Sequence, residues 1–386
     1  MWPALVASKL FKKGLCSNSF VADCPSCAES VEQSPNSLQL HSFKYKLFVS
    51  TWNVGGVAPP DDLNMEDLLD TRSSYCHIYV LGFQEVVPLQ ASNVLGAEKS
   101  KICMRWNSLI SEALNNETRG EGGGVPWGYE CVISKQMVGL LITVWVRSHI
   151  RRHIRHLSVS CVGCGIMGCL GNKGAVSVRF QLHETSFCFV CSHLASGGRQ
   201  GDEKHRNADA YDIFSRTCFP TSPAHDLSQN ILDHDCIIFL GDLNYRISLP
   251  DHEIRQLVGS QEWSKLLEND QLRMELVNGR VFQDWQEGAI SFAPTYKYQP
   301  NSDIYYECLP GKKDAKKRSP AWCDRIIWYG KGLKQQEYTR CESRLSDHRP
   351  VKATFSADVT VNFSIEQIKC QLDMCSIDET PCIYFN

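Results

Sequence analysis

Residues 236–246 read CIIFLGDLNYR, and this stretch decides the fold class of the chain. Its first five residues are apolar, which is the length of a buried β-strand. Three polar side chains, Asp242, Asn244 and Arg246, follow where the apolar run ends. A rigid strand that ends in polar residues is a common way to hold functional groups at the edge of a sheet. We therefore expect a strand that delivers these side chains to one rim of a domain.

Working outward, four other apolar runs carry polar residues of the same kind at one end. Each run has strand length, and each neighbouring polar residue is an amide, a carboxylate or an imidazole. Any one of these residues alone is explained as well by a solvated loop or a tight turn. Their joint occurrence at the ends of several predicted strands is what indicates a functional site. Its members are Asn53 near the end of 47–54, Glu85 after 78–83, His193 at the end of 186–193, and Asp347 and His348 before 350–355.

The remaining pattern predicts an α/β fold with many strands. Neighbouring runs are joined by short turns, such as Glu184-Thr185, which disfavours a doubly wound parallel sheet. We expect two sheets packed face to face with helices outside, a layered α/β sandwich. The further β-rich runs are 129–146, 157–161, 175–183 and 324–329, and the helix-like segments are 98–114, 202–214 and 264–276.

The domain is expected at 43–357, between a flexible N-terminal extension at 1–42 and a C-terminal tail at 358–386. The net charge of −3 gives no general reason to expect nucleic acid or membrane binding. The 19 cysteines are odd in number and several lie in apolar runs, which favours a reducing compartment, with the cytosol preferred. Lys9, Lys12 and Lys13 leave a transit peptide as an alternative. No apolar run approaches the roughly 20 residues of a membrane helix.

The residue types at the strand ends suit metal-assisted hydrolysis of a phosphate ester. Carboxylate and amide oxygens favour a hard cation such as Mg²⁺, for which Asn53 and Glu85 are candidates. Asp242 is placed to orient and deprotonate water, with Asn244 beside it for a phosphoryl oxygen. His193 and His348 are candidate hydrogen-bond donors to the transition state.

Two other phosphate chemistries are excluded by motif. No cysteine is followed six positions later by arginine, so the nucleophile loop of the cysteine phosphatases is absent. No Walker P-loop signature is present, which disfavours an NTPase.

These motifs resemble the catalytic domain of the inositol polyphosphate 5-phosphatases, and the resemblance covers about residues 45–356 in the order found in that family. GDLNYRI at 241–247 and PAWCDRI at 320–326 are the most specific of them. The chain looks most like plant members. The resemblance implies the deoxyribonuclease-like fold, a four-layer α/β/β/α sandwich of two mixed β-sheets. The other matching motifs are 48–56, 82–85, 171–176, 192–195, 294–298 and 346–351.

The resemblance also implies roles for the candidate residues. Glu85 looks like the principal Mg²⁺ ligand, completed by Asn53 and Asp347. Asp242 looks like the residue that activates water for direct attack on phosphorus, and Asn244 like a phosphate ligand. His348, paired with Asp324, resembles the imidazole that contacts the scissile phosphate, and His193 looks like a second donor.

Substrate contacts are implied in the same way. Tyr296, Lys297, Lys316 and Arg318 resemble the clamp for the neighbouring 4-phosphate, and Arg246 is placed with the substrate-binding residues. Lys173 is expected at the 1-phosphate or lipid headgroup. In the family, the loop that contains Ile166, Met167 and Leu170 touches acyl chains of a membrane lipid, and burial of these residues is an equally good explanation.

The expected function is thus Mg²⁺-dependent removal of the 5-phosphate from phosphoinositides at a membrane surface, from soluble inositol polyphosphates, or from both. An endonuclease or sphingomyelinase-like phosphodiesterase would share the catalytic residues, but not the motifs at 294–298 and 318–325. A catalytically dead lipid-binding adaptor would have lost Asp242, Glu85 or His348. Neither nucleic acid nor a transmembrane segment is expected. The choice between 4,5-bisphosphate and 3,4,5-trisphosphate, and the oligomeric state, stay open.

Overall fold

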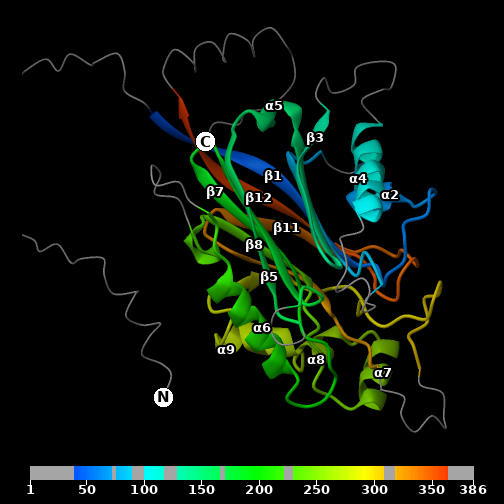
Figure 1. Ribbon diagram of the computed structural model, residues 1–386. Helices are drawn as coiled ribbons and strands as arrows, with labels where there is room; N and C mark the ends of the chain where they lie inside the picture. Colours follow the sequence, from blue (N-terminus) through cyan, green and yellow to red (C-terminus); the bar gives the residue numbers. More distant parts are fainter. Residues whose placement is uncertain are drawn as a thin grey trace, which may run out of the picture. The chain divides into compact units, whose positions relative to one another are not determined.

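The computed structural model describes residues 39–71, 75–88, 100–116, 128–165, 170–220, 229–307 and 318–363. Within these ranges the chain forms two six-stranded sheets that pack face to face, with helices on both outer faces (Figure 1). This is the four-layer α/β/β/α sandwich that the sequence predicts.

The first sheet has the strand order β11-β12-β1-β2-β4-β3. β1 and β2 run parallel, and every other neighbouring pair is antiparallel. The sheet is therefore mixed, as predicted. Its strands are β1 (Gln39–Asn53), β2 (Ile78–Gln84), β3 (Tyr129–Met137), β4 (Leu140–Arg147), β11 (Leu333–Arg340) and β12 (Val351–Phe363).

The second sheet has the order β5-β6-β7-β8-β10-β9 and is mixed in the same way. Only β7 and β8 pair in parallel. Its strands are β5 (Ile154–Gly163), β6 (Gly174–Leu182), β7 (Thr185–His193), β8 (Cys236–Asp242), β9 (Gln286–Glu287) and β10 (Asp324–Tyr329).

Alternation along the strands builds three apolar layers. In β1, Leu47 and Val49 face the second sheet and join one central core between the sheets. Phe48 and Trp52 point the other way, onto helices α2 (Met65–Leu69) and α4 (Ser100–Asn115). Since successive side chains of a strand point to opposite faces, one strand serves both cores.

The outer face of the second sheet is covered in the same manner by α6 (Glu203–Arg216) and α9 (Gln271–Asn278). Phe239 of β8 packs there against the rings of Phe214, Phe282 and Trp285. The short elements that complete the domain are α5 (Ser148–Arg151), η3 (Ile231–Asp233), α7 (Asp251–Gly259) and α8 (Trp263–Leu267).

Three sequence-based assignments differ from the structure. The single β-rich run at 129–146 is a hairpin of β3 and β4, turned by Val138 with φ 52° and by Gly139. The predicted helix at 264–276 is two helices, α8 and α9, because the Asp270 carboxylate accepts the backbone N–H of Arg273 at 2.9 Å and caps a new helix. The sequence pattern missed β11, whose residues LKQQEYTR contain no apolar run.

The ends of the domain are formed by its two longest strands. β1 begins at Gln39 and β12 ends at Phe363, so paired strands extend past both ends of the 43–357 range. They pair along nearly their whole length, which brings residues about 300 positions apart in the chain side by side.

Candidate active site

The functional side chains gather where the ends of central strands from both sheets meet. In the second sheet, Gly174, His193, Asp242 and Asp324 are register partners across four adjacent strands. In the first sheet, Asn53 is the register partner of Gln84, which places Glu85 immediately beyond it. The register therefore brings the predicted strand-end residues of each sheet to one edge of that sheet, and the packing of the two sheets brings the two edges together.

Asp242 lies at the centre of this group, and 2% of its surface is exposed. Its Oδ2 accepts a hydrogen bond from Asn53 Nδ2 at 2.9 Å and lies 3.1 Å from His193 Nε2. Its Oδ1 accepts the backbone N–H of Asn244 at 3.1 Å. Burial opposes ionisation, but His193, His348 and Lys173 together hold the pKa of Asp242 well below its usual range. Asp242 is therefore a carboxylate at any working pH.

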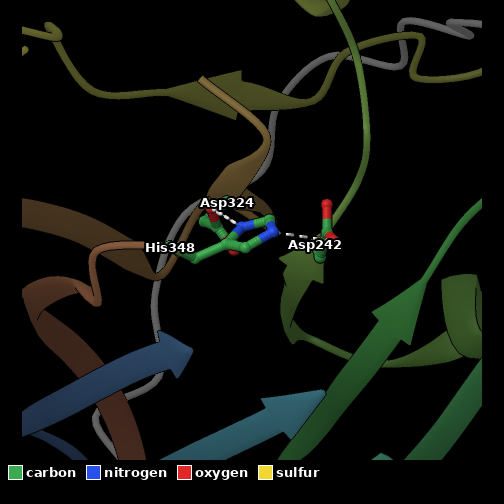
Figure 2. Close-up of side chains that lie close together, drawn as sticks. All are labelled: Asp242, Asp324 and His348. Atoms are coloured by element: carbon green, nitrogen blue, oxygen red, sulfur yellow. Dashed lines mark hydrogen bonds and ion pairs between the residues drawn. The ribbon is translucent and has the colours of Figure 1, made fainter. Parts of the chain in front are cut away.

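His348 lies between two carboxyl groups, as Figure 2 shows. Its Nδ1 donates to Asp324 Oδ2 at 2.8 Å, and its Nε2 points toward Asp242 Oδ2 at 4.0 Å. Burial lowers the pKa of His348, but the Asp324 and Asp242 carboxylates outweigh it and raise that pKa to about 9. The imidazole is thus protonated at neutral pH, with Nε2–H as its free donor.

The orientation of Asp324 is fixed from a third element. Thr295 Oγ1 donates to Asp324 Oδ2 at 2.7 Å, and the carboxyl group is fully buried. Burial raises the pKa of Asp324, while the bonds from His348 and Thr295 favour its ionised form. At neutral pH the pair consists of an ionised Asp324 and a protonated His348, because the carboxylates of Asp324 and Asp242 both stabilise the imidazolium.

The three predicted metal ligands lie on adjoining elements. Asn53 Nδ2 reaches Glu85 Oε1 at 3.3 Å, and Glu85 Oε1 lies 3.9 Å from His193 Nε2. Asp347 approaches the same place from the segment before β12, next to Gly55 with φ 59°. A Cβ at Gly55 would lie 3.2 Å from Asp347 Oδ1. Glycine is therefore required here by both its backbone and its neighbour.

Unlike Asp242, these carboxylates are accessible, with 27% of the Glu85 side chain and 26% of the Asp347 side chain exposed. Although burial works against it, His348 and Lys297 lower the pKa of Asp347. Two accessible carboxylates supply hard oxygen donors, which suit a divalent cation such as Mg²⁺. The Asn53 amide oxygen accepts the Gly55 backbone N–H at 3.0 Å and has a further lone pair for a cation.

A second group also has spacing that fits a metal ion. One potential ligand atom each of Asp242, Asp324 and His348 lies within 4.8 Å of the others, and all three residues are buried. The oxygen-rich group at Glu85 and this buried group adjoin each other, because Asn53 contacts both Glu85 and Asp242.

Cationic and aromatic side chains surround the catalytic group. The Tyr296 ring lies against His348, with 4.6 Å between ring centroids, and the Arg246 guanidinium lies 4.5 Å from the centroid of the same ring. Lys297 forms an ion pair with Asp347. Lys173 Nζ contacts His193 Nε2, and burial lowers the pKa of this lysine to about 8.

Five other predicted residues are placed less fully or lie outside the described residues. Arg318 is half-buried and its charge contributes to the pKa of Tyr296, which burial raises. Leu170, the first residue of the described range 170–220, is half-buried. Lys316, Ile166 and Met167 lie outside the described residues.

The sequence reasoning missed three residues that position the site. Thr295 holds Asp324, Trp52 Nε1 donates to the His348 carbonyl at 3.2 Å, and Ser346 Oγ donates to the Asn53 carbonyl at 2.7 Å. Their partners lie 29, 296 and 293 positions away in the chain. No local pattern reports such contacts, although all three residues lie inside the motifs that carried the resemblance.

Comparisons with known proteins agree with this geometry. Residues 50–354 match the endonuclease/exonuclease/phosphatase family 2. The type IV inositol polyphosphate 5-phosphatase 9 of Arabidopsis thaliana is 60% identical, over 94% of this chain and 92% of its own. The type I inositol polyphosphate 5-phosphatase 8 of the same plant is 48% identical, over 81% of this chain and 71% of its own.

Among solved structures, the inositol polyphosphate 5-phosphatase domain of SPsynaptojanin, in complex with inositol (1,4)-bisphosphate and calcium ion, superposes with a TM-score of 0.72. It is 31% identical, and the match covers 87% of this chain and 90% of that one. A Cimex nitrophorin has the same fold with a TM-score of 0.61 at 19% identity. No helix in the described ranges is long and apolar enough to cross a membrane.

Family match, sequence identity over nearly the full length and structural superposition all point the same way. The chain therefore belongs to the inositol polyphosphate 5-phosphatases, phosphoric monoester hydrolases of the endonuclease/exonuclease/phosphatase family 2.

Proposed function

We propose that this enzyme removes the 5-phosphate of phosphoinositides, of soluble inositol polyphosphates, or of both, with Mg²⁺ as its metal and by direct in-line attack of water. The observation that carries the proposal is the convergence of Asn53, His193 and His348 on the ionised carboxylate of Asp242. The likeness to a 5-phosphatase domain bound to inositol (1,4)-bisphosphate supports it, since that compound is what remains when inositol 1,4,5-trisphosphate loses its 5-phosphate.

Mg²⁺ is assigned to Glu85, Asn53 and Asp347 rather than to the buried group of Asp242, Asp324 and His348. An imidazolium has no lone pair to give a metal, and His348 Nδ1 is already bonded to Asp324. Glu85 and Asp347 are accessible carboxylates, as a cation that keeps several waters requires. When bound, the metal neutralises phosphoryl charge and makes water more acidic.

Asp242 is assigned to the attacking water. Its low pKa makes it a weak base, so its first role is to orient the water, and it accepts the proton as the bond to phosphorus forms. Asn53 and His193 hold Oδ2, and the Asn244 backbone holds Oδ1, so the carboxylate is fixed before substrate arrives.

Asn244 and the two histidines are assigned to the phosphoryl oxygens. One N–H of the Asn244 amide donates to the Leu194 carbonyl at 3.1 Å, which leaves the other for a phosphoryl oxygen. His348 donates from Nε2, and Asp324 keeps that donor charged and aimed. Charge that develops on the phosphoryl oxygens then meets donors that need no reorganisation.

The cations around this centre are assigned to the other substrate phosphates. Tyr296, Lys297, Lys316 and Arg318 are assigned to the 4-phosphate, and Arg246 is assigned to the substrate beside them. Lys173 is assigned to the 1-phosphate or headgroup. Its contact with His193 puts it within reach of the scissile group as well.

For the lipid substrate we infer peripheral binding at the cytoplasmic face of a membrane, with Leu170 and the neighbouring Ile166 and Met167 toward the acyl chains. None of the eleven cysteines of the described residues is in a disulfide, which fits a reducing compartment.

The test is phosphate release from phosphatidylinositol 4,5-bisphosphate, its 3,4,5-trisphosphate counterpart, soluble inositol 1,4,5-trisphosphate and a single-stranded oligonucleotide, each with Mg²⁺ and with chelator. Release from inositides in Mg²⁺ alone supports the proposal, and the relative rates rank lipid against soluble substrates. Release that persists in chelator, or cleavage of the oligonucleotide alone, would reject it.

A further inference from the structure

A surface pocket of about 540 Å³ adjoins Arg246 and has no role in the proposed chemistry. The loop before α6, the residues that follow Tyr245 and helix α9 form its walls. Its volume lies within the roughly 300–1,000 Å³ of small-ligand sites. The polar part of its lining consists of Arg199, Gln200, Glu203, Arg246, Ser248, Gln271, Glu275 and Arg280.

The charges in this pocket do not cancel. Arg280 is neutralised by Glu275, through two hydrogen bonds of 2.8 and 2.7 Å. Glu203 Oε2 accepts the backbone N–H of Gly201 at 3.0 Å. Among the residues that the structure describes, no carboxylate lies within ion-pair distance of Arg199 or Arg246. Arg246 donates from Nε to the Asn244 carbonyl at 3.1 Å and from Nη2 to Asn244 Oδ1, which leaves its Nη1 and the Arg199 guanidinium for an anion.

The pocket is joined to the catalytic centre by one short chain of contacts. The Asn244 backbone N–H donates to Asp242 Oδ1 at 3.1 Å, and Arg246 Nη2 donates to Asn244 Oδ1 at 2.6 Å. Arg246 also lies over the Tyr296 ring. One side of this arginine thus meets the catalytic group and the other lines the pocket.

We propose that the pocket binds one further ring phosphate of the substrate, beyond the 5- and 4-phosphates, through Arg199 and Arg246. The planar guanidinium fork matches phosphate oxygens two at a time, which favours this anion over a single-point ligand. The inference rests on the proposed function. The phosphate is either the 3-phosphate of a lipid or soluble headgroup, or the 6-phosphate of a soluble one.

The experiment compares kcat/KM of the wild type, Arg199→Ala and Glu203→Gln in Mg²⁺. The substrates are phosphatidylinositol 4,5-bisphosphate and inositol 1,4,5-trisphosphate, and the same compounds with a further 3-phosphate or, for the soluble form, a 6-phosphate. Arg199→Ala should lose about tenfold on the substrates with the further phosphate and stay within twofold on the others. Glu203→Gln removes a negative charge from the same pocket and should raise kcat/KM on those same substrates a few-fold.

The matched control is Arg152→Ala, which removes an exposed arginine next to α5. It should leave kcat/KM unchanged on every substrate, because α5 lies far from the site along β4. Phe83, which precedes the Gln84-Glu85 pair, pairs with Leu141 near the start of β4, whereas α5 follows the end of that strand at Arg147. A loss confined to 3-phosphorylated or to 6-phosphorylated substrates supports the pocket and identifies the phosphate.

Equal losses across the whole panel, or no loss at all, would overturn the pocket assignment while the enzyme still hydrolyses inositides. Absence of hydrolysis of every inositide by the wild type would instead reject the proposed function, and the pocket proposal with it.

Discussion

At the scale of single residues, Asp242 differs from the accessible carboxylates of Glu85 and Asp347 because it is buried and held by internal contacts. Asn53, His193 and the Asn244 backbone fix both oxygens of the Asp242 carboxylate, and 2% of this side chain is exposed. A group held this tightly contributes through position as much as through basicity.

Asp242→Asn should therefore abolish turnover and leave the fold intact. The amide keeps the size and an acceptor oxygen, but it carries no charge to orient water and cannot take its proton. We expect kcat to fall by at least 10³-fold, measured as phosphate release in Mg²⁺. The matched control is Asp62→Asn at an exposed position, which should keep full activity. If Asp242→Asn kept more than about a tenth of the wild-type activity, Asp242 would not be the residue that activates water.

The pair of His348 and Asp324 predicts how activity and stability depend on pH. The folded pKa of His348, about 9, exceeds the value of about 6.5 expected in the unfolded chain. The proton therefore stabilises the folded state fully below pH 6.5, and this contribution of about 3 kcal/mol is lost as pH rises through 9. If the imidazolium donates to phosphate, kcat should decline over the same alkaline range.

Asp324→Asn tests this assignment. It removes the charge that raises the pKa of His348, so the alkaline decline of kcat should move down toward pH 6.5–7. The measurement is a kcat–pH profile of both enzymes at saturating Mg²⁺. An alkaline limb at the same pH in both enzymes would show that another group, such as Lys173 with its pKa of about 8, controls it.

At the scale of helices and strands, the sequence predicted best where a pattern is local. The strands that carry Asn53, Glu85, His193 and Asp242 are apolar runs, so their existence and the rim they share could be read directly from the sequence. β11 could not, because an edge strand has one neighbour and buries little; only Leu333 and Tyr338 of its residues are buried. The break between α8 and α9 was also missed, although the Asp270 cap that begins α9 is a local feature.

That break predicts the effect of a substitution at Asp270. Its carboxylate caps α9 and accepts two hydrogen bonds of 3.0 Å from Arg325 Nη1, and both side chains are fully buried. Asp270→Asn keeps a capping oxygen but leaves Arg325 with Glu287 as its remaining carboxylate partner among the described residues. We expect a loss of about 2 kcal/mol, because the neutral amide replaces a carboxylate that accepts two charge-assisted hydrogen bonds in a fully buried place.

The measurement is urea denaturation, with Asp212→Asn as the control. Asp212 and Arg216 form an exposed i,i+4 pair at 3.6 Å, so its loss should change the unfolding free energy by less than about 0.5 kcal/mol. Equal effects of the two substitutions would show that burial of the Asp270–Arg325 pair carries no stability.

At the scale of the whole domain, the active site exists only because the two sheets pack together. Asn53 and Glu85 come with the first sheet, whereas His193, Asp242 and Asp324 come with the second. The bond from Asn53 to Asp242 crosses between the sheets and spans 189 positions of the chain. Sequence patterns predicted the residues on each side, but this contact depends on how the sheets pack, which no single strand specifies.

The same arrangement predicts that metal binding stabilises the whole fold. Glu85 and Asp347 reach the site from segments far apart in the chain, so a cation that both of them bind is held by the folded protein and not by the unfolded one. At a Mg²⁺ concentration one hundred times its dissociation constant, the gain is about 2.7 kcal/mol. For a domain of this size that corresponds to a rise in Tm of roughly 4 °C, measured by calorimetry in Mg²⁺ against chelator. Glu85→Gln should lose most of this rise, whereas Glu130→Gln, at an exposed position of β3, should keep it.

If Glu85→Gln kept the full rise and a variant of the buried group, Asp324→Asn, lost it, the metal would belong to Asp242, Asp324 and His348 instead.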